Sequence, residues 1–124
     1  MVKAGILKLA IEEAEKSNCR RYYIGAVVSK SGAILGSGHN AKRAHSIHKK
    51  YQIWAGSLHA EQAAVLGLDW SKLKGASILV VRITKGGNFS LARPCPTCFG
   101  LLNHIGIKKL FYTDRNGQIQ FERL

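Results

Sequence analysis

The sequence lacks any apolar stretch long enough to cross a membrane as a helix. Its most apolar segment, Ala76–Val81, is far shorter than the roughly 18–20 residues that a transmembrane helix requires, which excludes a membrane-spanning role. Proline is also scarce, with two in 124 residues, and there is no internal repeat, low-complexity stretch or linker. We therefore expect residues 1–124 to form a single domain, which at this length folds without a disulfide or a structural metal.

Cysteine is present in a small and odd number, three in all. The first 14 residues contain Glu12 and Glu13 and lack the continuous apolar core and the small-residue cleavage site of a secretory signal. A secreted, disulfide-stapled scaffold is therefore not expected. The cysteine usage predicts a reducing compartment and a cytoplasmic protein.

Acidic residues are few, because 7 Asp and Glu stand against 19 Lys and Arg, and the formal net charge is +12. This excess is larger than the solubility of a small domain requires, and it indicates a polyanionic partner. The cationic residues are spread along the chain, which predicts a basic surface or groove and not a disordered basic arm. The alternative is a generally basic soluble protein with no such partner.

The spacing of apolar residues predicts an amphipathic first helix over Val2–Lys16, with Glu12, Glu13 and Lys16 on its solvent side. Runs of apolar, aromatic and β-branched residues bounded by turn residues predict strands at 22–29, 33–39, 76–83, 107–113 and 118–124, and further helices are predicted at 58–68 and 96–104. The resulting order, α-β-β-α-β-α-β-β, predicts an α/β domain with a five-stranded sheet. The Asn-Gly turn before the last strand predicts a closing antiparallel hairpin.

Residues 40–57 form an unusually long connection for a compact domain. The segment has no helical or strand periodicity and is rich in basic and aromatic side chains. Because long ordered connections tend to be functional, we expect this segment to contribute to binding.

His59, Cys95 and Cys98 are the side chains in this sequence best suited to hold a metal ion. Catalytic zinc takes three protein ligands from nitrogen and sulfur and keeps a fourth position for water, and one His with a Cys-x-x-Cys pair supplies that number. The cysteine pair lies at the start of a predicted helix, where the helix N-terminus favours thiolates. Glu61, two residues after His59, points in a different direction from it and is available to move protons.

With the pattern His59-Ala60-Glu61 followed by Pro94-Cys95-Pro96-Thr97-Cys98, the chain resembles the zinc-dependent cytidine deaminase-like superfamily, whose signature is H-x-E followed by P-C-x-x-C. The resemblance covers essentially the whole chain. It implies a three-layer fold with a mixed sheet between helices, bound Zn²⁺, and hydrolytic deamination with Glu61 as the proton-transferring catalytic residue. It also implies that backbone N–H groups near Cys95 stabilise the developing oxyanion.

The resemblance further implies three substrate-binding residues. Asn40 lies where the family often has an asparagine that hydrogen-bonds the substrate, although an ordinary turn asparagine is the alternative at this position. Ala60 and Pro94, inside the two motifs, are expected to contact the substrate beside the metal.

Charge and aromatic content favour single-stranded nucleic acid, DNA or RNA, as the substrate. A basic groove can bind the phosphates of such a strand, and aromatic side chains can stack on its bases. The residues expected to contact the strand are Arg21, Lys42, Arg43, Lys49, Lys50, Tyr51 and Trp54. For Tyr51 and Trp54, hydrophobic anchoring of the connection is an equally good interpretation.

Three alternatives stay open. The first is a deaminase of a free nucleotide or nucleoside, dCMP or cytidine, and the second is an adenine deaminase acting on RNA. The third is a catalytically silent nucleic-acid-binding module with structural zinc, which an intact Glu61 disfavours, since a structural site has no need of that carboxylate. The compact antiparallel ending resembles free-cytidine deaminases, whereas those enzymes usually have Cys where this chain has His59.

Overall fold

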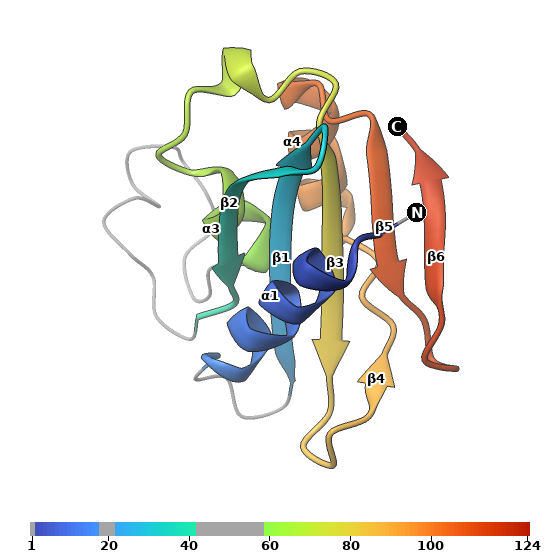
Figure 1. Cartoon of the computed structure of the whole chain (residues 1–124). Coiled ribbons are helices and arrows are strands. Elements are labelled where there is room, and N and C mark those ends of the chain that lie inside the picture. The colour runs from blue at the N-terminus through green and yellow to red at the C-terminus, as the bar shows by residue number, and fades with distance from the viewer. Residues whose placement is uncertain (1, 18–21, 42–58) are drawn as a thin grey trace.

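A computed structural model of the chain describes residues 2–17, 22–41 and 59–124 (Figure 1). Its helices are α1 (Ala4–Glu15), α3 (Ala60–Val65) and α4 (Pro96–Ile105), with a short 3-10 helix at Trp70–Lys72. The strands are β1 (Tyr23–Lys30), β2 (Ala33–His39), β3 (Ser77–Ile83), β4 (Phe89–Ser90), β5 (Lys109–Thr113) and β6 (Ile119–Arg123). None of the described helices is long and apolar enough to span a membrane.

The strands form one mixed sheet in the order β2-β1-β3-β5-β6, with the two-residue β4 pairing with β3. Strands β3 and β5 are parallel, whereas β1 is antiparallel to both of its neighbours and β6 is antiparallel to β5. The predicted mixed sheet with an antiparallel last hairpin is thus confirmed, but it has six strands where five were expected. Strand β4 was not predicted, because its pairing with β3 depends on a Gly-rich hairpin and not on a hydrophobic run.

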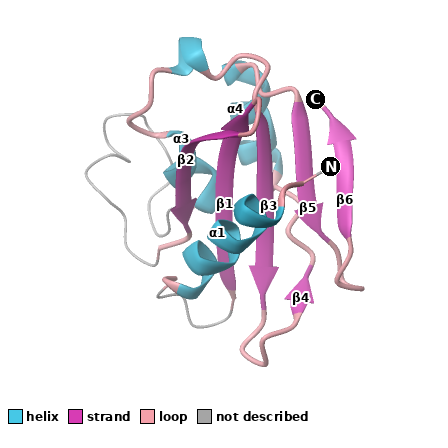
Figure 2. Cartoon of the chain, viewed as in Figure 1, coloured by secondary structure: helices cyan, strands magenta, loops and turns pink. Residues whose placement is uncertain are grey.

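Helices cover both faces of the sheet, as Figure 2 shows, with α1 on one face and α3 and α4 on the other. One buried cluster joins α1 to the face of β1 and β3 that presents Val27, Leu79 and Val81. The second and larger cluster packs α3 and α4 against the opposite face. The three-layer arrangement implied by the sequence motifs is therefore present, and the two motifs lie together in one layer.

Two glycines let the helices approach the sheet closely. A Cβ on Gly25 of β1 would overlap the backbone oxygen of Ala10 in α1, and a Cβ on Gly38 of β2 would lie 2.6 Å from backbone atoms of Ala63 and Ala64 in α3. Real Cβ atoms do not come so close, so each helix depends on a glycine beneath it. The second contact sets the depth at which α3 lies on the sheet.

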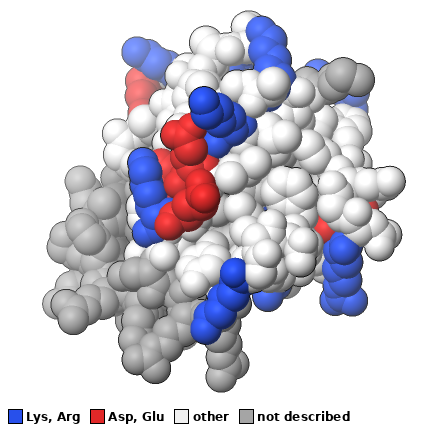
Figure 3. All heavy atoms as spheres, turned by 60° about the horizontal axis from the view of Figure 1, so that its bottom comes forward, with Lys and Arg blue, Asp and Glu red and all other residues white. Residues whose placement is uncertain are grey.

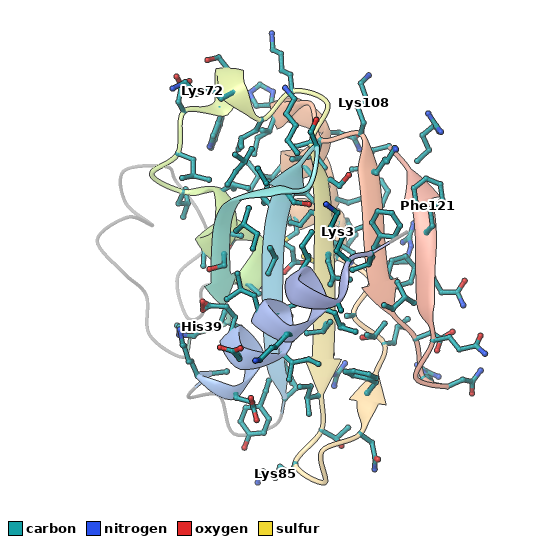
Figure 4. All side chains as sticks on the ribbon, viewed as in Figure 1. Lys3, His39, Lys72, Lys85, Lys108 and Phe121 are labelled. Atoms are coloured by element: carbon teal, nitrogen blue, oxygen red, sulfur yellow. The ribbon has the colours of Figure 1, made fainter. Side chains whose placement is uncertain are left out.

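The expected solvent exposure of Glu13 is wrong. Its side chain turns from α1 toward β2, where its carboxylate accepts a hydrogen bond from the Ser37 hydroxyl at 3.1 Å and lies 3.0 Å from Nδ1 of His39. His39 lies beside the end of α1 in Figure 4. Glu13 is 7% exposed, because it lies on the same side of the helix as Ala10 and Ala14. Helical spacing alone did not separate a buried acid with partners from a solvated one.

The second predicted helix, 58–68, is shorter in the structure. Helix α3 ends at Val65, because Leu66 has an extended backbone and Gly67 adopts φ +85°. The indole N–H of Trp70 then donates to the Val65 carbonyl at 3.0 Å, which satisfies a backbone acceptor freed at the helix end. The third predicted helix is confirmed as α4, and Gly106 closes it in the left-handed conformation.

Candidate metal centre

Three potential metal ligands meet at the N-terminal ends of α3 and α4. His59 is the N-cap residue of α3, and its backbone N–H donates to the Gln62 side chain at 2.9 Å, which stabilises the first turn. Cys95 is the N-cap residue of α4, and Cys98 lies in the first turn of that helix, where Pro96 fits the first helical position. The two helix starts therefore bring together residues that are 36 or more positions apart in the sequence.

The ligand atoms are spaced for a tetrahedral ion. Nδ1 of His59 lies 3.1 Å from the sulfur of Cys98 and 3.6 Å from that of Cys95, and the three ligand atoms all lie within 4.8 Å of one another. Zn–N and Zn–S bonds of roughly 2.0 and 2.3 Å at a tetrahedral angle separate nitrogen from sulfur by about 3.5 Å. The donor set and its spacing fit zinc with one position left for another ligand.

Of the three potential ligands, Cys98 most needs a bound cation to lose its thiol proton. It is fully buried, and burial, followed by the nearby Glu61 and Cys95, raises the pKa of its thiol far above the ordinary range. A bound divalent cation reverses this effect, because a coordinating thiol loses its proton. The buried sulfur therefore fits a metal ligand better than a free thiol.

Glu61 lies in the first turn of α3 and is 4% exposed. Burial raises the pKa of Glu61 to about 7, an effect that a backbone hydrogen bond partly offsets. Its side chain lines the same cavity as His59 and Cys95. The carboxyl group is thus placed to exchange protons with a molecule bound beside the metal ligands.

The cavity has a volume of about 290 Å³, at the lower end of the range for small-molecule sites. Tyr22, Ile24, Asn40, Arg82, Leu91, Ala92 and Arg93 complete its lining. Ile24 comes from the first residues of β1 and Arg82 from the end of β3, so the lining combines apolar and cationic side chains with the metal ligands. A polar, partly charged molecule of moderate size fits these walls.

A family model described as the cytidine and deoxycytidylate deaminase zinc-binding region matches residues 3–114. The chain belongs to this deaminase family. The resemblance predicted from the two motifs is confirmed, as are the zinc-dependent cytidine/deoxycytidine-type deaminase activity and the zinc cofactor that it implied.

Individual relatives agree with the family. The deoxycytidylate deaminase of Mycobacterium phage D29 is 27% identical over 124 residues, with 86% of this chain and 89% of that protein covered. The dCMP deaminase of cyanophage S-TIM5, solved in apo form, is 26% identical with a TM-score of 0.65, and the match covers 92% of this chain and 86% of that one. A cytidine deaminase from Burkholderia pseudomallei, 19% identical with a TM-score of 0.67 over 99% of this chain and 93% of that one, shares the fold.

Asn40, predicted to bind substrate, lies at the cavity wall of this deaminase and is 4% exposed. Its side-chain oxygen accepts from the Ile24 N–H at 2.9 Å, and its amide nitrogen donates to the Tyr22 carbonyl at 3.3 Å. These bonds fix the start of β1 and leave one amide N–H for a ligand. A substrate role for Asn40 stays a prediction.

The other predicted contacts divide into two groups. Ala60 and Pro94 are buried and are not among the described residues that line the cavity, so their substrate contacts also stay predictions. The expected nucleic-acid contacts Arg21, Lys42, Arg43, Lys49, Lys50, Tyr51 and Trp54 all lie outside the described residues.

Sequence reasoning missed the cationic part of the cavity, which consists of Arg82 and Arg93. Arg93 lies immediately before the Pro-Cys motif and makes a two-pronged ion pair with Glu122 of β6 at 2.6 and 3.1 Å. Arg82 interrupts the apolar run that extends from Ile78 to Ile83 in β3, and that interruption was a signal available in the sequence.

Proposed function

We propose that this protein deaminates cytosine in a free nucleotide or nucleoside, with dCMP as the representative substrate. The observation that carries the proposal is the placement of Glu61 beside His59 and Cys95 in one small cavity. The family description, cytidine and deoxycytidylate deaminase, and relatives named as deoxycytidylate deaminase and dCMP deaminase support the choice of cytosine and of a small substrate.

The proposed reaction adds water to the ring carbon that bears the exocyclic amine and releases ammonia, so that cytosine plus water gives uracil plus ammonia. His59, Cys95 and Cys98 would hold zinc, which would supply Lewis acidity that lowers the pKa of water toward neutrality. The Glu61 carboxylate takes one proton from water and delivers it to the ring nitrogen, and it then passes the second proton of that water, from the hydroxyl added to the ring carbon, to the departing amine. Its burial keeps bulk water from competing for these transfers.

Deamination of cytosine in single-stranded nucleic acid is the second candidate, and the net charge of +12 favours it. Of the 19 cationic residues, six lie at positions 20, 21, 42, 43, 49 and 50, outside the described part of the chain. Figure 3 shows Lys and Arg side chains standing apart on the face it presents, without forming a continuous basic track among the described atoms.

The deciding experiment compares dCMP, deoxycytidine and cytidine with a cytosine-containing single-stranded oligonucleotide, using zinc-loaded protein at several salt concentrations. We expect turnover of the free substrates. Turnover of the oligonucleotide alone, weakening as salt rises, would contradict the main proposal and favour the second candidate. Loss of turnover in Glu61→Gln establishes that the activity belongs to this protein.

A further inference from the structure

Arg82 brings a cation into the same cavity as the proposed reaction. In β3 it follows Ile78 and Val80 on the sheet face covered by α3 and α4, one step closer to the end of the strand. Ile78 and Val80 pack into the core. Arg82, in contrast, lines the cavity together with His59, Glu61 and Cys95. A buried sheet face therefore ends in a guanidinium at the site.

The donors of Arg82 are not used by the described protein. Its Nε is buried and has no hydrogen-bond partner, and no carboxylate among the described residues lies within ion-pair distance of its guanidinium. Arg93, the other cavity arginine, differs because Glu122 engages its Nε and Nη2. A buried donor without a partner costs free energy, so the position calls for an acceptor supplied by a ligand.

One contact positions the guanidinium of Arg82, and another anchors its backbone. It lies over the ring of Tyr22, 4.8 Å from the ring centroid, in a cation–π contact. Its backbone N–H donates to Oγ1 of Thr113 at 3.1 Å, and that hydroxyl donates to the Ser90 carbonyl at 2.8 Å. The contact with Tyr22 restricts the side chain before a ligand binds, which reduces the entropy lost on binding.

We propose that Arg82 binds the 5′-phosphate of the substrate and so makes the enzyme prefer a cytosine nucleoside monophosphate over the nucleoside. This inference rests on the proposed function and adds a specificity-determining residue to it. A guanidinium matches the oxygens of a phosphate with paired N–H donors, and phosphate is the one part of a cytosine nucleotide that carries full negative charge. The neutral base and sugar have no use for an uncompensated cation.

The test uses Arg82→Gln, Arg82→Lys and a charge-matched control, Arg115→Gln, in the exposed 114–117 turn away from the cavity. For each zinc-loaded protein, kcat/KM is measured with dCMP and with deoxycytidine, and binding of the product dUMP is measured by calorimetry. Thermal unfolding and zinc content verify that each variant is folded and loaded.

We expect Arg82→Gln to lower kcat/KM for dCMP and the affinity for dUMP by about 10- to 100-fold, the range for a lost charge-assisted hydrogen bond, and to change kcat/KM for deoxycytidine by less than about threefold. Arg82→Lys keeps the charge but lacks the paired N–H donors of a guanidinium. Its kcat/KM for dCMP and its affinity for dUMP should fall between those of Arg82→Gln and the wild type. Arg115→Gln behaves as the wild type.

Equal losses for dCMP and deoxycytidine, or unchanged dUMP binding in Arg82→Gln, would overturn the phosphate assignment and leave the proposed function standing. A loss confined to a single-stranded oligonucleotide would assign the contact to a strand phosphodiester and would also overturn it. Failure of the wild type to deaminate any free substrate overturns the proposed function, and in that case dUMP binding still decides whether Arg82 holds phosphate.

Discussion

At the scale of single residues, Glu61 illustrates how burial prepares a side chain for chemistry. It is 4% exposed, and no cation among the described residues lies within ion-pair distance of it. The cavity that it lines also contains two of the metal ligands, apolar and polar groups, and two arginines. Burying such a carboxyl costs folding free energy, so its presence in the cavity indicates a functional role.

Replacing Glu61 with Gln tests this role with almost no change of shape. We expect the variant to fold and to keep its zinc, because none of the three proposed ligands is altered, whereas kcat should fall by at least about 10²–10⁴, the usual contribution of a general acid–base group. Metal analysis and steady-state kinetics check both parts. Glu12→Gln, on the exposed side of α1, is the matched control, and Glu61→Gln turnover within tenfold of the wild type would rule out the proposed proton transfer.

At the scale of elements, the close approach of α1 to β1 leaves no room for a side chain at Gly25. Gly25→Ala places a methyl group on the backbone of Ala10, so α1 has to shift. We expect a loss of about 1–3 kcal/mol in the free energy of unfolding, as for other overpacked sites, measured by urea denaturation.

Gly5→Ala in the same helix is the control for that substitution. Nothing lies within 4 Å of the position of its new Cβ, and alanine favours the helix, so this variant should be neutral or more stable. Equal stability of Gly25→Ala and Gly5→Ala would contradict the packing seen between α1 and β1.

The contact between α1 and β2 makes stability depend on pH through Glu13. Burial raises the pKa of Glu13, but hydrogen bonds from His39 and Ser37 together with the charge of Lys16 outweigh it, and the pKa lies below its ordinary value. A carboxyl with a lowered native pKa stabilises the fold above its unfolded pKa, and this contribution is lost as pH falls through the native pKa.

We therefore expect Glu13→Gln to lower Tm near neutral pH, with a difference from the wild type that shrinks as pH falls below about 4, where glutamate protonates in the unfolded chain. Thermal unfolding from pH 7 to pH 3 measures that difference. Glu12→Gln, on the exposed side of the same helix, should show no such convergence. A constant Tm difference for Glu13→Gln across this range would show that the ion pair does not contribute.

At the scale of the whole molecule, most of the architecture follows from patterns in the sequence. The strands around Ala76–Ile83 and Tyr22–Ser29 were predictable because runs of apolar and β-branched residues leave few alternatives, and the motif around His59 and Cys95 located the metal centre. The helix predicted at 58–68 continues past the observed end of α3. That end depends on a left-handed Gly67 and on a tertiary hydrogen bond from Trp70, which local patterns do not contain.

Features that depend on partners distant in the sequence were not predictable. Glu13 is buried only because β2 brings Ser37 and His39 to it. Helical periodicity contains no information about this tertiary contact. Arg82 lies in the cavity only because β3 pairs with β1, opposite Ile24. In both cases a polar residue in an apolar pattern was the available sign.

Metal removal is expected to affect the molecule as a whole. A ligand that binds only the native state stabilises it by RT ln(1 + [L]/Kd), about 2.7 kcal/mol at a hundredfold excess over Kd. Chelation should therefore lower Tm and abolish activity, and added zinc should restore both. Cys95→Ala should resemble the chelated wild type, whereas Thr97→Ala, exposed between the two cysteines, should not. A zinc-free protein with unchanged Tm would contradict the proposed centre.

The three ligands are unevenly spaced along the chain, two within one helical turn and one far from both. Cys95 and Cys98 are close enough in sequence to meet within one helical turn, so an unfolded chain already holds them at high effective concentration. His59 is 36 residues from Cys95 and joins them only after a long loop has closed and β3 has taken its place in the sheet between β1 and β5. The complete set of three ligands therefore exists only in the native fold, and full coordination is a signature of native assembly.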